Sequence, residues 1–227
     1  MSRRIIASCG LALLAAVAIA GCGGGSNAGT TSTDATAVIP ATTLTTIGAV
    51  PETPTTLAPA PLEPIVVPTL PAVIPGYTEI DPATGLHMTG TPTVVDFAVY
   101  RLKVSGLVAN ELSLSYDDLR RLPKLTASPN LVCVGFFTDT ATWSGASLET
   151  VLQMAGIQDD AERIALKAAD GYSISLTLEE ALRPENFLAY ELEGQPIPVL
   201  HGFPIRAVIP GENGNYWVKW LTEIEVA

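Results

Sequence analysis

Short apolar segments alternate with polar turns along the C-terminal part of the chain, which is the pattern of a domain built mainly from strands. Before residue 105, Tyr100, Leu102 and Val104 alternate with two cations, as expected for a strand with one buried face. A hairpin-like turn is expected at Asp170-Gly171, between two apolar runs. The predicted strands cover residues 97–104, the run that ends at 133, and residues 164–168, 172–176, 188–192, 205–209 and 217–226.

Three short helices are predicted between these strands. Ser115 is placed as the N-cap of the first, ahead of an acidic first turn. The second covers residues 147–155 and ends at Gly156, and the third covers residues 177–182. Because single helices interrupt the strands without regular β–α–β alternation, the expected fold class is α+β.

The first 22 residues have the pattern of an export signal. A basic start is followed by an uncharged apolar run, from residue 5 to residue 20, that is too short to span a membrane comfortably. Small residues then precede Cys22, and this segment resembles the lipobox of bacterial lipoproteins. The resemblance implies a lipoprotein signal peptide over residues 1–22 and a lipid on Cys22, which anchors the protein to the outer face of the cytoplasmic membrane or in the periplasm or cell envelope. The alternative is an ordinary signal peptide followed by an incidental cysteine.

Arg3 and Arg4 are compatible with two export routes. They resemble the core of a twin-arginine signal, which is used by proteins that fold around a cofactor before export. They equally suit the basic start of an ordinary secretory signal. Both routes place the folded domain outside the cytoplasm.

Residues 23–90 differ in composition from the rest of the chain. They contain ten prolines and many threonines but no lysine or arginine. Such a segment favours extended conformations and cannot bury a core, so we expect a disordered linker that holds the domain away from the membrane. Residues 91–227 are then long enough for one domain with its own core.

Acidic residues dominate the charge of the chain. Twelve basic and 23 acidic residues give a net charge of −11, and removal of the signal takes away two of the basic ones. This balance argues against nucleic acid or an anionic membrane surface as a partner.

Cysteine and histidine are scarce, which limits the possible chemistry. Two of the three cysteines lie in the signal, so Cys133 has no partner for an intramolecular disulfide. A lone thiol in an exported protein is either buried and inert or a ligand or nucleophile. The residues leave open a thiol enzyme that uses Cys133 and His201, whereas two histidines in all disfavour a His-rich zinc site.

A loop constrained by glycine and proline places His201 and Arg206 five residues apart. Such a loop can present two donors to a phosphate or an oxyanion. The spacing alone favours a structural role, in which His201 caps a turn and Arg206 pairs with an acid. Further along, Lys219 lies between two apolar residues, and alternation along a strand places it on the solvent side.

Taken in order, several segments resemble one family, the molybdopterin-binding oxidoreductase domain of sulfite oxidases and of periplasmic methionine-sulfoxide reductase catalytic subunits. The resemblance covers nearly the whole domain and implies a single α+β domain with mixed sheets and short helices. Its pieces are residues 100–108, Cys133 followed by Trp143-Ser144-Gly145, and residues 170–176, 188–198, 201–206 and 218–221.

The resemblance also implies a set of cofactor-binding residues. In the family, the cysteine that matches Cys133 supplies a thiolate to molybdenum, and a soft thiolate suits such a metal. By the same resemblance Asp170 binds the pterin, while His201 and Arg206 hold the cofactor and its phosphate, which reverses the structural interpretation of their loop. Further cofactor contacts are expected from Tyr216, Trp217 and Val218.

Three departures from the family pattern bear on the substrate and the cofactor. Family members that bind sulfite carry arginines just after the cysteine, whereas residues 134–140 contain none and include Asp139. Tyr216 stands where a basic residue is expected, and no arm that could contact the pterin is matched before Phe97. A sulfite oxyanion site is therefore not expected.

Two functions follow from these observations. The first is a lipid-anchored, extracytoplasmic oxidoreductase that uses the molybdenum cofactor to transfer an oxygen atom to or from a small substrate. Because the chain has no Cys-x-x-Cys-His motif and no spare cysteines for an iron–sulfur cluster, its electrons would pass to a separate membrane or haem protein. The alternative is the same fold without cofactor, acting as a cell-surface binding or interaction module, which the missing arm and missing arginines favour.

Overall fold

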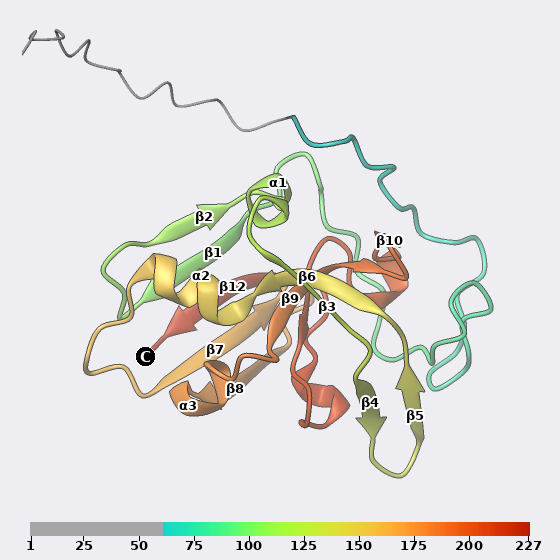
Figure 1. Ribbon diagram of the computed structural model, residues 1–227. Helices are drawn as coiled ribbons and strands as arrows, with labels where there is room; N and C mark the ends of the chain where they lie inside the picture. The colour runs from blue at the N-terminus through green and yellow to red at the C-terminus, as the bar shows by residue number, and fades with distance from the viewer. Residues whose placement is uncertain (1–60) are drawn as a thin grey trace, which may run out of the picture. The chain divides into compact units, whose positions relative to one another are not determined.

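The structure of the protein, a computed structural model, describes residues 61–227, drawn in colour in Figure 1. The signal, Cys22 and the first part of the linker lie outside the described residues. Among the helices of residues 61–227, none is long and apolar enough to cross a membrane.

In chain order the elements are β1 (Leu102–Gly106), β2 (Leu112–Leu114), α1 (Tyr116–Arg120), β3 (Lys124–Ala127), β4 (Asn130–Cys133), β5 (Phe137–Thr140), β6 (Trp143–Ser147), α2 (Leu148–Ala155), β7 (Arg163–Ala168), β8 (Ser173–Thr177), α3 (Leu178–Ala181), β9 (Phe187–Leu192), β10 (Gln195–Pro196), the 3-10 turn η1 (Val199–His201), β11 (Arg206–Val208), the 3-10 turn η2 (Gly214–Tyr216) and β12 (Leu221–Val226).

Two five-stranded sheets and a hairpin form the described domain. In the first sheet the order is β2-β1-β12-β7-β8, and only β1 and β12 pair in parallel. In the second the order is β10-β9-β6-β3, with β11 also paired to β9, and every pair is antiparallel. Strands β4 and β5 form a separate hairpin that projects from the domain (Figure 1). Mixed sheets with a few short helices confirm the α+β class.

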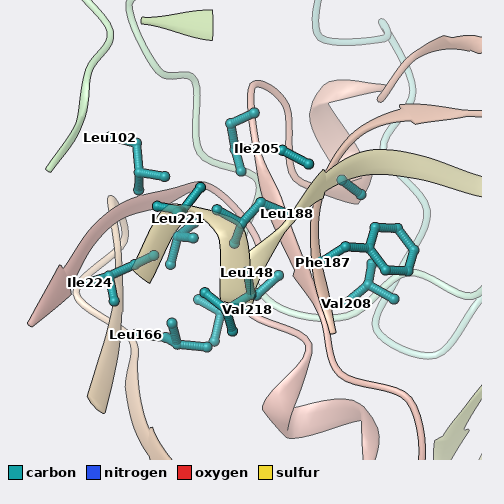
Figure 2. Close-up of a cluster of buried hydrophobic side chains, with 14 of the residues drawn as sticks. Leu102, Leu148, Leu166, Phe187, Leu188, Ile205, Val208, Val218, Leu221 and Ile224 are labelled. Carbon is teal, nitrogen blue, oxygen red and sulfur yellow. The ribbon is translucent and has the colours of Figure 1, made fainter. Parts of the chain in front are cut away.

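Apolar side chains of both sheets meet in one core, part of which Figure 2 shows. Alternate residues of the first sheet point inward, so Leu102, Leu166 and Ile224 are completely buried. The second sheet adds Leu188, and α2 adds Leu148 to the same cluster. Removal of this apolar surface from water holds the two sheets together.

A close approach of β6 and β9 requires glycine at position 145. A Cβ at this position would lie 2.0 Å from the carbonyl oxygen of Leu188 and 2.6 Å from the Cα of Ala189. A bulge between Ser144 and Gly145 shifts the strand register at the same point. The Trp143-Ser144-Gly145 motif therefore has a packing role in the second sheet.

The predicted helices agree with the structure at their ends. Ser115 caps α1 and forms a capping box with Asp118. Helix α2 follows its N-cap Ser147 and ends at Gly156, which adopts the left-handed conformation with φ of 69°. Thr177 caps α3 in the same way as Ser115 caps α1. Caps depend on near neighbours in the sequence, which is why the pattern finds them.

Two predicted strands begin four or five residues later than expected. Strand β1 is shorter because residues 97–99 form a turn. Residues 217–220 do not belong to β12, since they bond to the loop before β11 instead, where the Trp220 N–H donates to the Gly202 carbonyl at 3.3 Å. The alternation assumed for this segment therefore fails at Lys219.

The last part of the expected linker, residues 76–90, is folded, and we call it the arm. Its two halves pair, because the Thr78 N–H donates to the Met88 carbonyl at 2.8 Å and the Met88 N–H donates to the Glu79 carbonyl at 2.7 Å. Leu86 and Met88 are buried, at 6% and 1% exposure. The structure thus differs from the expected domain boundary at residue 91. Composition alone could not show that these two apolar residues find a surface to pack on.

Candidate functional site

A cavity of about 290 Å³ opens where the arm, the β4–β5 hairpin and the loops after β7, β10 and β11 meet. These segments are far apart in the sequence, so only the folded chain forms the cavity. Four of the seven residues predicted to bind the cofactor line it, namely Cys133, Asp170, His201 and Arg206.

His201 ends the turn η1, and only 1% of its side chain is exposed. Its Nε2 lies 2.9 Å from Oδ2 of Asp81 and 2.9 Å from Oγ1 of Thr84, both in the arm. Burial lowers the pKa of His201 to about 4; Lys219 and Arg206 act in the same direction, and the hydrogen bond with Asp81 opposes them. The imidazole is therefore neutral at pH 7 and donates its Nε2 proton to the Asp81 carboxylate.

Arg206 is a buried cation without a counter-ion in the part of the chain that the structure describes. Its guanidinium carbon lies 4.9 Å from the ring centre of Trp143 and 5.6 Å from that of Trp217. The hydrogen bond from Nη1 to the His201 carbonyl is long, at 3.4 Å, and Nε has no partner within residues 61–227. Burial lowers the pKa of Arg206 to about 9, so the group stays protonated at neutral pH. Burying such a charge is costly, and an anionic ligand would offset the cost.

Lys219 is a cavity residue that the sequence pattern did not predict. Its Nζ donates to the carbonyl of Thr89 at 2.7 Å and to that of Leu200 at 3.0 Å, and the side chain lines the same cavity as Arg206. Burial, together with the nearby charge of Arg206, lowers the pKa of Lys219 to about 7. The expectation of a solvent-facing lysine is wrong because residues 217–220 do not continue β12. The one signal in the sequence was a lysine inside an apolar run.

Cys133 and Asp170 reach the cavity from two different turns. Cys133 is the last residue of β4, is partly exposed and is a free thiol. Asp170 lies between β7 and β8, where its Oδ1 accepts from the Tyr172 N–H at 2.9 Å. The thiol is available as a soft metal ligand, and the carboxylate retains a second oxygen that can accept hydrogen bonds.

His87 and Asp139 form a pair that the sequence pattern did not predict, because His87 falls in the expected linker. Oδ2 of Asp139 accepts from the backbone N–H of His87 at 2.8 Å, and Oδ1 lies 2.7 Å from the imidazole Nδ1. The imidazole stacks on Phe137, with 4.2 Å between ring centres and 7° between ring planes. All three side chains line the cavity, so the pair joins the arm to β5 at the site itself.

Three predicted residues do not line the cavity. Tyr216 is packed at the edge of the core, while Trp217 and Val218 are buried within it at 2% and 1% exposure. Trp217 acts on the site indirectly, since its ring lies beside Arg206. The adjacent Asn215 lines the cavity instead. Direct cofactor contact by the three stays a prediction.

Comparison with known families identifies the domain. A profile described as oxidoreductase molybdopterin binding domain matches residues 88–227, more than half of the chain. The chain belongs to this family. The match confirms the resemblance inferred from the ordered motifs, and it begins within the arm rather than after it.

Individual relatives of this molybdopterin-binding domain carry several names. The putative protein-methionine-sulfoxide reductase subunit YedZ1 of Azospira oryzae is 34% identical over 132 residues, which cover 58% of this chain and 50% of that protein. The uncharacterized oxidoreductase YuiH of Bacillus subtilis is 31% identical over 143 residues, 62% of this chain and 71% of that protein. Mitochondrial sulfite oxidase of Mus musculus is 36% identical over 162 residues, 58% of this chain but only 30% of that protein. The chain thus spans about half of the first protein and less than a third of the last.

A solved structure shares the fold. The sulfane dehydrogenase SoxCD from Paracoccus pantotrophus matches with a TM-score of 0.60 and 23% identity, over 67% of this chain and 44% of that chain. At this identity the similarity concerns the fold alone. It confirms the expected single domain of sulfite-oxidase type.

The cavity fits the cofactor of the family. Arg206 lies buried and Lys219 half-buried at it, with no paired carboxylate among residues 61–227, which suits the phosphate of molybdopterin, and the free thiol of Cys133 suits molybdenum. Membership of the family confirms molybdopterin as the expected cofactor. The cofactor-free alternative is not favoured, because the arm that it took to be missing is present and lines the cavity.

The neutral state of His201 predicts a loss of stability in mild acid. The folded protein resists protonation of this group down to about pH 4, whereas the unfolded chain takes up the proton below about 6.5. The free energy of unfolding is therefore expected to fall between these two pH values, by up to roughly 3 kcal/mol. The pKa of Asp81 is also lowered, so this carboxylate also destabilises the folded protein in acid. Its effect begins only below its ordinary pKa of 3.8, which is outside this pH range. Urea unfolding of the wild type and of His201→Gln at several pH values measures the effect; parallel curves for the two proteins would contradict it.

Proposed function

We propose that this protein is a molybdenum-dependent oxidoreductase that acts outside the cytoplasm and transfers an oxygen atom to or from a small substrate. The observation that carries the proposal is the meeting of Cys133, Arg206 and Lys219 at one cavity. A free thiol beside a buried arginine and a half-buried lysine, neither paired with a carboxylate among residues 61–227, is a donor set that suits a metal on an anionic cofactor. Family membership supports the cofactor class.

Each part of the cofactor has residues suited to hold it. Arg206 and Lys219 bind the phosphate through charge-assisted hydrogen bonds, and the neutral, fixed imidazole of His201 lies beside them. Asp170 accepts hydrogen bonds from the pterin. Cys133 binds molybdenum as a thiolate and so loses its proton on loading. When bound, the cofactor supplies two-electron chemistry that moves an oxygen atom.

The surroundings of the cavity support a neutral substrate. Tyr77 and Tyr172 line it and are 66% and 42% exposed, and Phe136 packs edge-on against Tyr77 with 6.4 Å between ring centres. The hairpin segment from Cys133 to Asp139 contains no cation. In this proposal Arg206 and Lys219 bind the cofactor phosphate. A dianion such as sulfite would therefore lose its hydration at the site without gaining a cationic partner. A sulfoxide or an N-oxide fits the site better.

A separate protein is proposed to exchange electrons with the site. The sequence has three cysteines, two of them in the signal, and lacks a Cys-x-x-Cys-His haem motif. A membrane protein or a haem protein would therefore carry the electrons. The name of the Azospira oryzae relative, which calls it a subunit, supports such an arrangement.

The proposed location rests on residues 1–22. We propose that Cys22 is lipidated and anchors the domain in the cell envelope. The native protein is then expected to partition into detergent and to have the intact mass of a diacylglyceryl-modified chain that begins at Cys22. Cys22→Ala is expected to abolish the modification. A native protein with an unmodified Cys22 would contradict the anchor.

Molybdenum content after Cys133→Ala tests the cofactor site. The variant is expected to lose molybdenum or activity, because it loses the thiolate, while folding changes by only about 1–2 kcal/mol. Elemental analysis of protein made in a host that supplies the cofactor measures the loss, and urea unfolding measures the stability. Val132→Ala is a matched control, since Val132 is the preceding residue of β4 and does not line the cavity. A well-folded wild type without molybdenum from such a host would contradict the proposed function.

Substrate preference tests the interpretation of the cavity mouth. The loaded protein is expected to reduce a sulfoxide or an N-oxide with a higher kcat/KM than that with which it oxidises sulfite, because the hairpin offers no cation to a dianion. Steady-state assays with dimethyl sulfoxide and a reduced dye, and with sulfite and an artificial acceptor, give the ratio. A higher kcat/KM for sulfite would show that Arg206 and Lys219 are not both occupied by the cofactor phosphate, as proposed here.

A further inference from the structure

The pair formed by His87 and Asp139 lines the cavity but has no part in holding the cofactor as proposed above. Asp139 accepts from the backbone N–H of His87 at 2.8 Å and lies 2.7 Å from the imidazole Nδ1. An ionised carboxylate can accept hydrogen bonds but cannot donate them. Nδ1 of His87 must therefore carry the proton of this hydrogen bond, whether the ring is neutral or charged. Asp139 is 8% exposed, so its charge acts on the ring with little screening by water.

Stacking and pairing leave one edge of the His87 ring free. One face lies on Phe137, and the Nδ1 edge is held by Asp139. Within residues 61–227, no hydrogen bond or ion pair reaches Nε2, and the side chain is 25% exposed at the same cavity as Cys133. The Nε2 edge is therefore what the ring offers to a molecule in the cavity.

Three other proton donors that line the cavity, on His201, Lys219 and Tyr172, already make hydrogen bonds within the protein. Nε2 of His201 is bonded to the arm, and burial lowers the pKa of this group to about 4. Nζ of Lys219 donates to two carbonyls, and the Tyr172 hydroxyl donates to the Asn215 carbonyl at 2.9 Å. The remaining ionisable side chains that line the cavity are Tyr77, Cys133, Asp170 and Arg206.

We propose that His87 delivers a proton to the oxygen atom of a neutral oxo-substrate, and that Asp139 is the positioning residue that holds its ring. The inference rests on the proposed function and deepens it. Reduction of a sulfoxide breaks the S–O bond, consumes two electrons and two protons, and yields a sulfide and water. The electrons come from a low-potential one-electron donor outside the chain. Nε2–H of the imidazolium gives one proton to the departing oxygen, and solvent gives the second and reprotonates Nε2.

The carboxylate of Asp139 has two effects on this step. Its negative charge stabilises the imidazolium that precedes proton transfer. Its two hydrogen bonds, to the backbone and to the ring of the same residue, fix the direction in which Nε2 points. Both effects are lost if the carboxylate becomes an amide.

Three variants separate these roles. His87→Asn keeps an amide N–H near the position of Nδ1 and removes Nε2. Asp139→Asn keeps the size of the side chain and removes its charge. Thr140→Val is the matched control, because Thr140 follows Asp139 in β5, is exposed, and bonds to Asn130 at 2.7 Å away from the cavity lining.

Turnover is measured with the full chain loaded with molybdenum, using dimethyl sulfoxide as the substrate and reduced methyl viologen as the electron donor. His87→Asn is expected to lower kcat about 100-fold and Asp139→Asn about 10- to 100-fold, at unchanged molybdenum content. Thr140→Val is expected to behave as the wild type.

A second readout does not depend on activity. The chain contains two histidines, so the imidazole ¹⁵N signals of His87 are assigned by their loss in His87→Asn. In the cofactor-free full chain, neutral His87 is expected as the Nδ1–H tautomer. In Asp139→Asn the amide oxygen stays with the backbone N–H, so the amide NH₂ faces Nδ1 and the ring proton moves to Nε2.

The possible results discriminate between the two proposals. A loaded, active wild type whose His87→Asn variant keeps its turnover overturns this inference alone. Loss of molybdenum from His87→Asn also overturns it, because His87 would then hold the cofactor. An Nε2–H tautomer of His87 in the wild type also overturns the inference, because Nδ1 would then carry no proton to donate to Asp139. A wild type that carries no molybdenum overturns the proposed function and with it this inference.

Discussion

Arg206 lies beside the rings of Trp143 and Trp217, and no carboxylate of the described residues forms an ion pair with it. The second sheet imposes this arrangement. Strand β11 carries the arginine and β6 carries Trp143, and both strands pair with β9. Burial is the main cause of the lowered pKa values of His201 and Lys219, and the charge of Arg206 acts in the same direction on both. An anionic ligand in the cavity would offset the cost of burying the charge of Arg206.

The arm supplies the polar partners that the loops of the domain need at the site. Asp81 and Thr84 bond to His201, the Thr89 carbonyl accepts from Lys219, and His87 bonds to the hairpin. Buried polar groups are stable only when they are hydrogen-bonded, so the arm belongs to the site as well as to the fold. It also brings the cavity its second imidazole.

The distribution of charge separates the surface of the protein from its site. The chain has a net charge of −11, and several surface cations are paired with acids, as in the bonds of Lys167 with Glu225 at 2.8 Å and of Arg183 with Glu212 at 3.0 Å. Arg206 is instead buried at the cavity, and Lys219 is half-buried there. Positive potential is therefore concentrated where a cofactor phosphate would lie, while the exposed surface disfavours anionic partners.

Local signals in the sequence were enough to predict the helix ends, most of the strands and the family of this protein. The caps at Ser115 and Gly156 and the alternation in the strands depend on near neighbours, and the ordered motifs around Cys133, Asp170, His201 and Arg206 were sufficient to indicate the family. Only the tertiary structure decided the rest. It turned Lys219 toward the cavity by starting β12 only at Leu221, and it turned the last part of a proline-rich linker into an arm that pairs His87 with Asp139 across 52 positions of the chain. Burial and contacts between distant segments depend on the surface that the folded chain presents to each residue, and no pattern of neighbouring residues contains that information.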